Sequence, residues 1–168
     1  TAFQYLENIT GIDFVETTST VYDEVNIAFG NNYSGAYSYL DNGFWDVYPD
    51  SAIATHAVVN VSPTWYNGGA NVENDYVLQT FIHEILHALG LGHQGYYNGS
   101  ANYPTDADFD NDSWQNSIMS YFTTTENTAV DADFAFLQSV MAADLLALDA
   151  LYGSQSYNGT TFGTGSAF

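Results

Sequence analysis

Three of the four histidines lie in the stretch Thr80-Phe-Ile-His-Glu-Ile-Leu-His-Ala-Leu-Gly-Leu-Gly-His93. His83 and His87 are four positions apart, so on a helix their imidazoles lie one turn apart on the same face. Gly90 allows the chain to turn away from the helix axis, because glycine accepts a positive φ, and the turn can return His93 to the same point. Three neutral imidazoles with an open fourth position are typical of a catalytic zinc site rather than a closed structural one.

Glu84 directly follows the first of these histidines and can reach a water bound at the predicted metal position. The histidines, this glutamate and Gly90 fix five positions of the pattern His-Glu-x-x-His-x-x-Gly-x-x-His. In a chain with 4 His and 14 Gly, a chance match has a probability on the order of 10⁻⁵. We therefore interpret the stretch as a zinc motif, in preference to a buried helix that happens to carry histidines.

The composition limits the partners of the chain. Its 168 residues, 46% of them hydrophobic, fit a single domain with a buried core. The chain carries 20 acidic residues and no lysine or arginine, which gives a formal net charge of −20. Such a surface repels nucleic acid and anionic membranes, and no apolar run approaches the roughly 20 residues of a membrane span. We expect neither partner, and we expect the domain to act as a monomer.

Hydrophobic periodicity predicts three helices and four strands. The helices are expected over 1–10, over 75–88 with Asn74 as N-cap, and over 139–151 with Gly153 after the end. The strands are expected over 12–18, 24–29 and 52–61, with a short one within 37–48. The last helix has an apolar face formed by Val140, Ala143, Leu146, Ala147 and Leu151. The segment 94–115 has no periodicity and is predicted to be irregular.

Two further groups of residues are candidates for the site or for a second one. Alternating aspartates in the predicted loop could supply the carboxylate oxygens of a calcium site: Asp106, Asp108, Asp110 and Asp112. Their spacing is not that of an EF-hand, and the alternative is an exposed acidic loop. His56 lies on the 52–61 strand, and we expect it at the rim of the site rather than as a fourth ligand, because three imidazoles suffice.

Six stretches follow one another in an order typical of one protease family: 25–30 (Val-Asn-Ile-Ala-Phe-Gly), 48–49 (Tyr-Pro), 80–93, 95–98 (Gly-x-Tyr-Asn), 117–121 (Ser-Ile-Met-Ser-Tyr) and 151–153 (Leu-Tyr-Gly). With them the chain resembles the metzincin metalloproteases, and most of all the catalytic domain of the serralysins, which are secreted bacterial proteases. The resemblance covers about residues 5–153. The chain departs from serralysins at Gln94, where they usually have proline, and in a shortened first helix.

The resemblance implies a metzincin fold of the α/β class, α+β type. Such a fold has a twisted mixed sheet with an antiparallel edge strand, an active-site helix, a C-terminal helix and an irregular lower half. We expect it to form one catalytic domain over 1–153. The Gly/Ser/Thr-rich segment 154–168 would then be a tail or the start of a further C-terminal module, such as the calcium-binding repeats into which serralysins usually continue.

The resemblance also assigns roles to individual residues. It makes His83, His87 and His93 the zinc ligands and Glu84 the general base. Tyr121 corresponds to a tyrosine that can also ligate zinc and that supports the transition state, although a core tyrosine is the alternative. Met119 corresponds to the Met-turn residue beneath the metal, and its flexible thioether also suits simple packing there. The sheet edge that pairs with extended substrates would be formed by His56, Ala57, Val58 and Val59.

The function implied is that of a secreted zinc endopeptidase that hydrolyses peptide bonds of protein substrates. The alternative is a catalytically silent zinc-binding homologue that serves as a binding or structural module of a larger extracellular protein. Glu84 and Tyr121 favour the enzyme, because a binding module needs neither a general base nor a hydroxyl donor at the metal.

Overall fold

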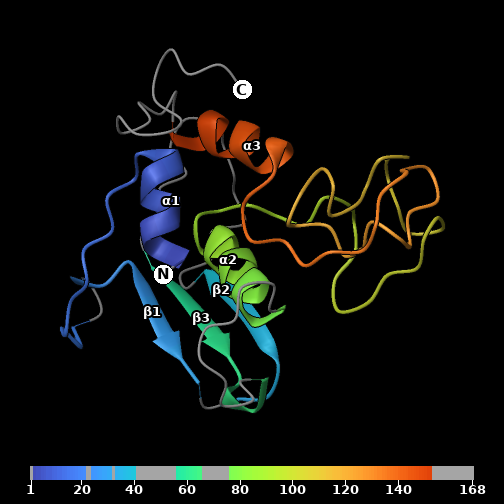
Figure 1. Ribbon diagram of the computed structural model, residues 1–168. Coiled ribbons are helices and arrows are strands. Elements are labelled where there is room, and N and C mark those ends of the chain that lie inside the picture. Colours follow the sequence, from blue (N-terminus) through green and yellow to red (C-terminus); the bar gives the residue numbers. More distant parts are fainter. Residues whose placement is uncertain (1, 22–23, 32, 41–55, 66–75, 153–168) are drawn as a thin grey trace.

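The computed structural model describes residues 2–21, 24–31, 33–40, 56–65 and 76–152 (Figure 1). These ranges contain the helices α1 (Ala2–Thr10), α2 (Tyr76–Ala88) and α3 (Ala142–Tyr152), the 3-10 turn η2 (Pro63–Trp65), and the strands β1 (Ile27–Gly30), β2 (Ala36–Leu40) and β3 (Ala57–Val61). The Asn74 cap, Gly153 and the 154–168 tail lie outside the described residues. None of the helices in these ranges is long and apolar enough to cross a membrane.

The three strands form one mixed sheet in the order β1-β3-β2. β1 runs parallel to β3, with Ile27 opposite Ala57, and β2 runs antiparallel to β3, with Tyr39 opposite Val58. The predicted mixed sheet with an antiparallel edge strand is confirmed, and that edge strand is β2. The prediction that 56–59 forms the edge is wrong, because β3 is the central strand and is paired on both sides.

The composition of β3 explains its central place. Ala57 and Val59 are fully buried and Val61 is nearly so, and the three pack with Ala88 of α2. Apolar, β-branched residues suit a strand that is enclosed by neighbours. The sequence pattern of such a strand indicates which side chains are buried, but it does not tell whether both backbone edges are paired.

The larger part of the core lies between the helices. Leu6 of α1, Ile85 of α2 and Leu148 of α3 are each at most 1% exposed and belong to one apolar cluster, which also contains Met119. Figure 1 shows the chain between α2 and α3 as long irregular loops to one side of α2. The predicted irregular lower half is therefore confirmed. Within its described residues, β-type pairing is limited to one isolated bridge between Asn98 and Ser100.

Three predicted elements differ from the structure. The strand expected over 24–29 begins only at 27 and ends at 30. The segment 12–18 is not a strand; its alternation arises because Phe14 packs on Phe3 of α1, with ring centroids 4.8 Å apart, while the intervening residues are exposed. The last helix begins at 142 instead of 139, and its predicted apolar face is wrong at Leu146, which is 71% exposed. Asp144 and Leu148 are buried instead, because apolar residues occur on all sides of α3 and do not single out one face.

Gly90 ends α2 in the way that the motif requires. Its φ is +98°, its N–H donates to the His87 carbonyl (2.9 Å), and the next N–H, of Leu91, donates to the Leu86 carbonyl (3.0 Å). These are the two hydrogen bonds of a Schellman motif, which reverses the chain after a helix. The reversal carries the chain from His87 back toward His93.

Replacing Gly90 by alanine is expected to lower the free energy of unfolding by about 1–2 kcal/mol, because an L-residue is strained at positive φ. A Cβ at this position would approach only Leu151, at 3.6 Å, so the cost lies in the backbone and not in a clash. Denaturant unfolding of the metal-free protein measures it. Gly92→Ala is the matched control, since Gly92 is exposed, has no positive φ and has open space around its Cβ position. An equal loss in both variants would contradict the prediction.

Candidate metal centre

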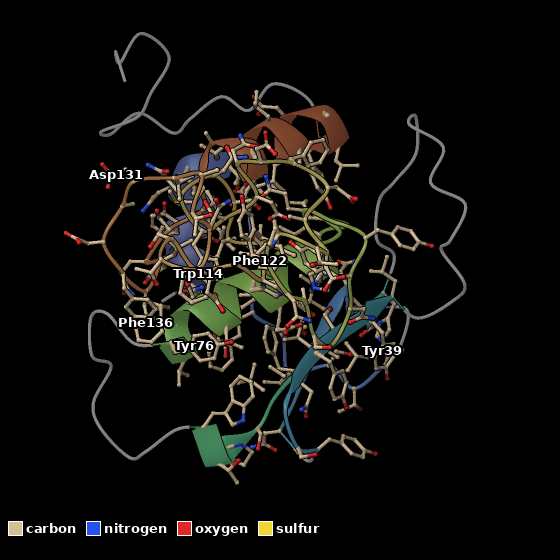
Figure 2. The ribbon with its side chains drawn as sticks, turned by 90° about the vertical axis from the view of Figure 1, so that its right-hand side faces the viewer. Tyr39, Tyr76, Trp114, Phe122, Asp131 and Phe136 are labelled. Atoms are coloured by element: carbon tan, nitrogen blue, oxygen red, sulfur yellow. The ribbon has the colours of Figure 1, made fainter. Side chains whose placement is uncertain are left out.

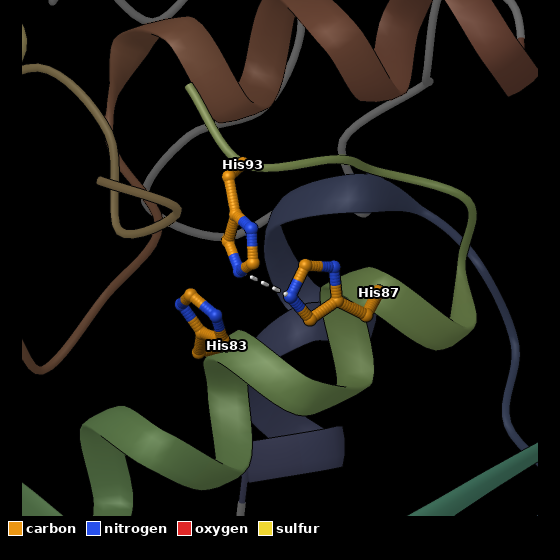
Figure 3. A group of neighbouring side chains, drawn as sticks. All are labelled: His83, His87 and His93. Carbon is orange, nitrogen blue, oxygen red and sulfur yellow. Dashed lines mark hydrogen bonds between the residues drawn. The ribbon is translucent and has the colours of Figure 1, made fainter. Parts of the chain in front are cut away.

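The structure brings the three motif histidines together (Figure 3). His83 and His87 project from successive turns of α2, and His93 returns from the loop after Gly90. One ring nitrogen from each lies within 4.8 Å of those of the other two. Within the described part of the chain, these three form the only group of three or more His, Cys, Asp or Glu side chains that could share an ion.

Hydrogen bonds fix the orientation of each ring. Every Nδ1 lies at hydrogen-bond distance from a backbone carbonyl oxygen: His83 from Ile118 (2.9 Å), His87 from Leu91 (2.7 Å) and His93 from Tyr97 (2.9 Å). A carbonyl oxygen only accepts, so in each neutral ring the proton is on Nδ1 and the lone pair is on Nε2. A hydrogen bond from Nδ1–H to an acceptor is typical of histidines that bind a metal through Nε2.

The chemistry of these nitrogens fits a zinc ion. His87 Nε2 and His93 Nε2 lie 3.0 Å apart, and with both protons on Nδ1 the two lone pairs face each other (Figure 3). A cation between the nitrogens removes this repulsion. Tetrahedral zinc with ligand distances near 2.0–2.1 Å would place two nitrogens about 3.3 Å apart, close to the spacing found.

Burial keeps the imidazoles in the form that binds metal. Desolvation lowers the pKa of His83 to about 3, helped by the neighbouring His87. Desolvation likewise lowers the pKa of His87 to about 4, and it lowers the pKa of His93. All three rings are therefore neutral near pH 7, and little proton competition opposes metal binding there.

Glu84 lies one residue after His83 on α2 and is only 6% exposed. Its Oε2 is buried and has no hydrogen-bond partner within the part of the chain that the structure describes. Burial raises the pKa of this carboxyl to about 7. A carboxyl with a pKa near the working pH can take a proton and give it back, which is what a general base and acid must do.

The structure places Tyr121 beside the histidines. Its ring centroid is 4.4 Å from that of His93 and 6.4 Å from that of His83, and its hydroxyl accepts the Gly99 N–H (3.2 Å). Met119 is 2% exposed and belongs to the core cluster, which agrees with a packing role. Its carbonyl accepts the N–H of Gln94, the residue after the third histidine (3.4 Å).

Asp144 is a supporting residue that the sequence did not indicate. It is 1% exposed, and its carboxylate accepts three hydrogen bonds: from the Ser117 hydroxyl (2.6 Å), the Ile118 N–H (2.9 Å) and the Met141 N–H (2.7 Å). Because the carbonyl of Ile118 accepts from Nδ1 of His83, Asp144 fixes the loop that orients this histidine. Burial raises the pKa of Asp144 although these bonds act in the opposite direction. The only signal in the sequence was a pair of aspartates in a largely apolar helix, Asp144 and Asp149, and nothing in the pattern distinguishes the buried one.

The remaining sequence candidates lie elsewhere. Asp106, Asp108 and Asp110 are exposed, Asp112 is fully buried, and no metal-binding group is formed among them in the described residues. Two of them hold backbone N–H groups, Asp106 that of Asn102 (2.7 Å) and Asp108 that of Tyr96 (2.9 Å), so the structure does not support the calcium site. His56 is 7% exposed, not a rim residue, and its Nδ1 lies 2.6 Å from the Val25 carbonyl.

A cleft with a volume of about 470 Å³ opens beside the histidines. It is lined by Ala36 of the edge strand β2, by His83 and Glu84 of α2, and by Tyr121. Aromatic side chains form one wall of the cleft. Trp65, Tyr76 and Trp114 line it, and Figure 2 shows the last two near Phe136. The ring centroid of Tyr76 lies 6.4 Å from Trp114 and 5.5 Å from Phe136.

Comparison with known proteins places this site in a family. The family model described as matrixin (Peptidase_M10) matches residues 1–111 of the 168. The chain belongs to the matrixin family. Serralysin of Photorhabdus laumondii is 31% identical to this matrixin-family chain over 166 residues, which are 92% of the chain and 32% of the relative. Serralysin C of Dickeya chrysanthemi is 42% identical over 98 residues, 54% of the chain and 20% of the relative.

A third relative, metallopeptidase AprA of Pseudomonas marginalis, is 30% identical over 165 residues, 86% of the chain and 34% of the relative. The matches confirm the resemblance to the serralysins and the metzincin fold of the matrixin family. The chain spans only about a third of the length of the Photorhabdus and Pseudomonas relatives.

Proposed function

We propose that the chain is the catalytic domain of a zinc-dependent endopeptidase, with the domain over 1–153. The observation that carries this proposal is the convergence of three Nε2 lone pairs, each oriented through Nδ1, next to a buried carboxyl without a partner among the described residues. Membership of the matrixin family supports the same activity. The serralysin relatives support a secreted protease.

His83, His87 and His93 would hold the zinc ion. When bound there, zinc supplies Lewis acidity to polarise a peptide carbonyl and lowers the pKa of a bound water to about 7. Neutral imidazoles leave the positive charge of the ion undiminished, which strengthens both effects. Their Nδ1 contacts to backbone carbonyls keep the three rings from rotating out of position.

Glu84 acts as general base and then as general acid. Its carboxylate takes the proton of the attacking water and delivers it to the nitrogen of the leaving amine. The buried position supports this role, because it raises the pKa of the carboxyl to about 7. At such a pKa the group can both take a proton from water and release it to the leaving amine. The Oε2 atom has no competing hydrogen bond among the described residues, which leaves it available to water and substrate.

Tyr121 offers its phenolic O–H to the oxygen of the scissile carbonyl as negative charge develops there. Donors in this role typically contribute about 2.7–4 kcal/mol of transition-state stabilisation. The position of the ring, 4.4 Å from that of His93, supports the assignment. A second role as a zinc ligand in the resting enzyme stays a prediction from the family resemblance.

Protein substrates would bind in extended form along β2. This strand is the antiparallel edge of the described sheet, and its Ala36 lines the cleft that also contains Glu84. A free strand edge can accept a peptide as a further strand, with main-chain hydrogen bonds giving affinity. β2 thus replaces 56–59 as the proposed substrate-binding edge.

Zinc content and chelator-sensitive cleavage together test the proposal. We expect the purified 168-residue chain to hold one zinc and to cleave a fluorogenic peptide library or casein. Removing the metal with 1,10-phenanthroline should abolish cleavage, and adding zinc back should restore it. One bound zinc without any chelator-sensitive cleavage would contradict the proposal and favour the alternative, a silent zinc-binding module. The retained Glu84 with its buried oxygen argues against that alternative.

A further inference from the structure

Asp112 is a buried carboxylate without a cationic partner. It is 0% exposed, and the chain contains no lysine or arginine that could pair with it. Its oxygens accept a short hydrogen bond from the Ser120 hydroxyl (2.6 Å) and bonds of 3.1 and 3.2 Å from the Tyr97 hydroxyl. Burying a charge is unfavourable unless its hydrogen bonds are well satisfied. The hydroxyl of Tyr97 is therefore one of the groups that stabilise the buried carboxylate.

Tyr97 contacts both the third histidine and Tyr121. Its backbone carbonyl accepts the Nδ1–H of His93 (2.9 Å), and its hydroxyl accepts the backbone N–H of Tyr121 (3.3 Å). Its ring packs against both, with centroids 5.7 Å from His93 and 4.8 Å from Tyr121, whose rings are 4.4 Å from each other. Burial raises the pKa of Tyr97 to about 12, so the hydroxyl keeps the proton that it donates to Asp112.

The backbone of the loop before Tyr97 passes close to the ring of this residue at Gly95. A Cβ added to Gly95 would lie 2.5 Å from Cε1 of the Tyr97 ring and 3.2 Å from an oxygen of Asp112. Both distances are shorter than ordinary contacts, so a larger residue at this position would have to displace the ring. Glycine at position 95 thus permits the close approach of backbone to ring, and the approach helps to fix the ring.

We propose that Tyr97, clamped by the carboxylate of Asp112, is a positioning residue that sets Tyr121 against the histidine site. The inference rests on the proposed function, because it concerns a residue to which that function assigns catalysis. Tyr97 makes its two hydrogen bonds with different atoms. Its hydroxyl accepts the Tyr121 N–H, and its main-chain carbonyl accepts the Nδ1–H of His93. A change of side chain can therefore separate them.

Tyr97→Phe removes the hydroxyl and leaves the carbonyl in place. We expect hydrogen exchange of the Tyr121 amide, measured by NMR, to become at least about tenfold faster, since its acceptor is lost. We expect kcat to fall about tenfold with KM within about twofold, as for other residues that orient a reacting group. Zinc affinity, measured by competition with a chelating dye, should stay within about threefold, because the contact to His93 is main-chain.

A double-mutant cycle separates positioning from general weakening of the fold. In a Tyr121→Phe background, Tyr97→Phe should lower kcat less than about twofold, because the group that it positions is already absent. Tyr103→Phe is the matched control: it also removes one hydroxyl in the same loop region, which among the described residues donates to the Asp110 carbonyl (3.3 Å), and it should change neither amide exchange nor kcat. An equal loss of kcat in both backgrounds, or unchanged Tyr121 exchange in Tyr97→Phe, would overturn the proposal.

Gly95→Ala gives a second route if Tyr97→Phe does not fold. It removes no hydrogen-bonding group but displaces the Tyr97 ring, and it should likewise speed exchange of the Tyr121 amide. Normal exchange in a folded Gly95→Ala protein would count against the clamp. The exchange measurement needs no substrate, so a chain that fails to cleave peptides but shows the exchange effect would refute the proposed function and leave the positioning of Tyr121 intact.

Discussion

Replacing Glu84 by glutamine is expected to lower kcat by a factor of about 10²–10⁴ and to leave one zinc bound per chain. The factor is the usual contribution of a general acid or base, and glutamine cannot take a proton from water. Zinc should remain because Glu84 is not among the three grouped side chains. The peptide assay gives kcat, and atomic absorption gives the zinc content.

The fold of this variant should be at least as stable as that of the parent chain. Glu84 is 6% exposed, and its Oε2 has no hydrogen-bond partner among the described residues, so an amide of the same shape breaks no observed bond. Removing a buried ionisable group also removes its desolvation cost. Glu126→Gln is a matched control on an exposed loop and should leave kcat unchanged. Turnover by Glu84→Gln within tenfold of the parent would rule out the proposed base.

Replacing Asp144 by alanine is expected to lower the free energy of unfolding by about 3–5 kcal/mol, as when one partner of a buried charged contact is removed. The substitution leaves the Ser117 hydroxyl and the N–H groups of Ile118 and Met141 without their buried acceptor. The free energy of unfolding of Asp144→Asn should lie between those of the parent chain and of Asp144→Ala, since the Ser117 hydroxyl can turn to accept from the amide. Denaturant unfolding of the three proteins measures this order.

The same substitution should weaken zinc binding by about 10–100-fold, because the Ile118 carbonyl that holds His83 lies on the loop fixed by Asp144. Chelator competition at a temperature where the variant is folded tests this. Asp149→Ala, on the same helix, is the control and should change stability by less than about 0.5 kcal/mol. Asp144→Ala with the stability of the control would show that the three contacts contribute little.

Local spacing predicted the parts of the site that are close in sequence. His83 and His87 converge because four positions make one helical turn, and Gly90 supplies the reversal that brings His93 to them. These relations need no knowledge of the rest of the fold. The α2 helix was predicted for the same reason, since it follows from a periodic run of residues, whereas the mixed sheet was predicted from the family resemblance.

The residues that support the site were not predicted because their contacts are distant in sequence. Asp144 binds Ser117 across 27 positions and Asp112 binds Tyr97 across 15. Alternation made Asp112 look like a calcium ligand, whereas the fold buries it and leaves its neighbours Asp108 and Asp110 exposed. The strand β3 was placed at the edge from the family resemblance, and its side-chain pattern could not correct this, because that pattern indicates the burial of a face and not the pairing of backbone edges.

The Nδ1 atom of each motif histidine is oriented by a carbonyl oxygen of the main chain. Every residue type carries that acceptor, so the identity of the side chains at positions 91 and 118 does not itself set the direction of the rings. Both side chains are buried in the apolar core, so replacements there are limited to residues that fill the same space. The candidate metal centre is most sensitive at residues such as Gly90 and Asp144, which determine where those carbonyls are.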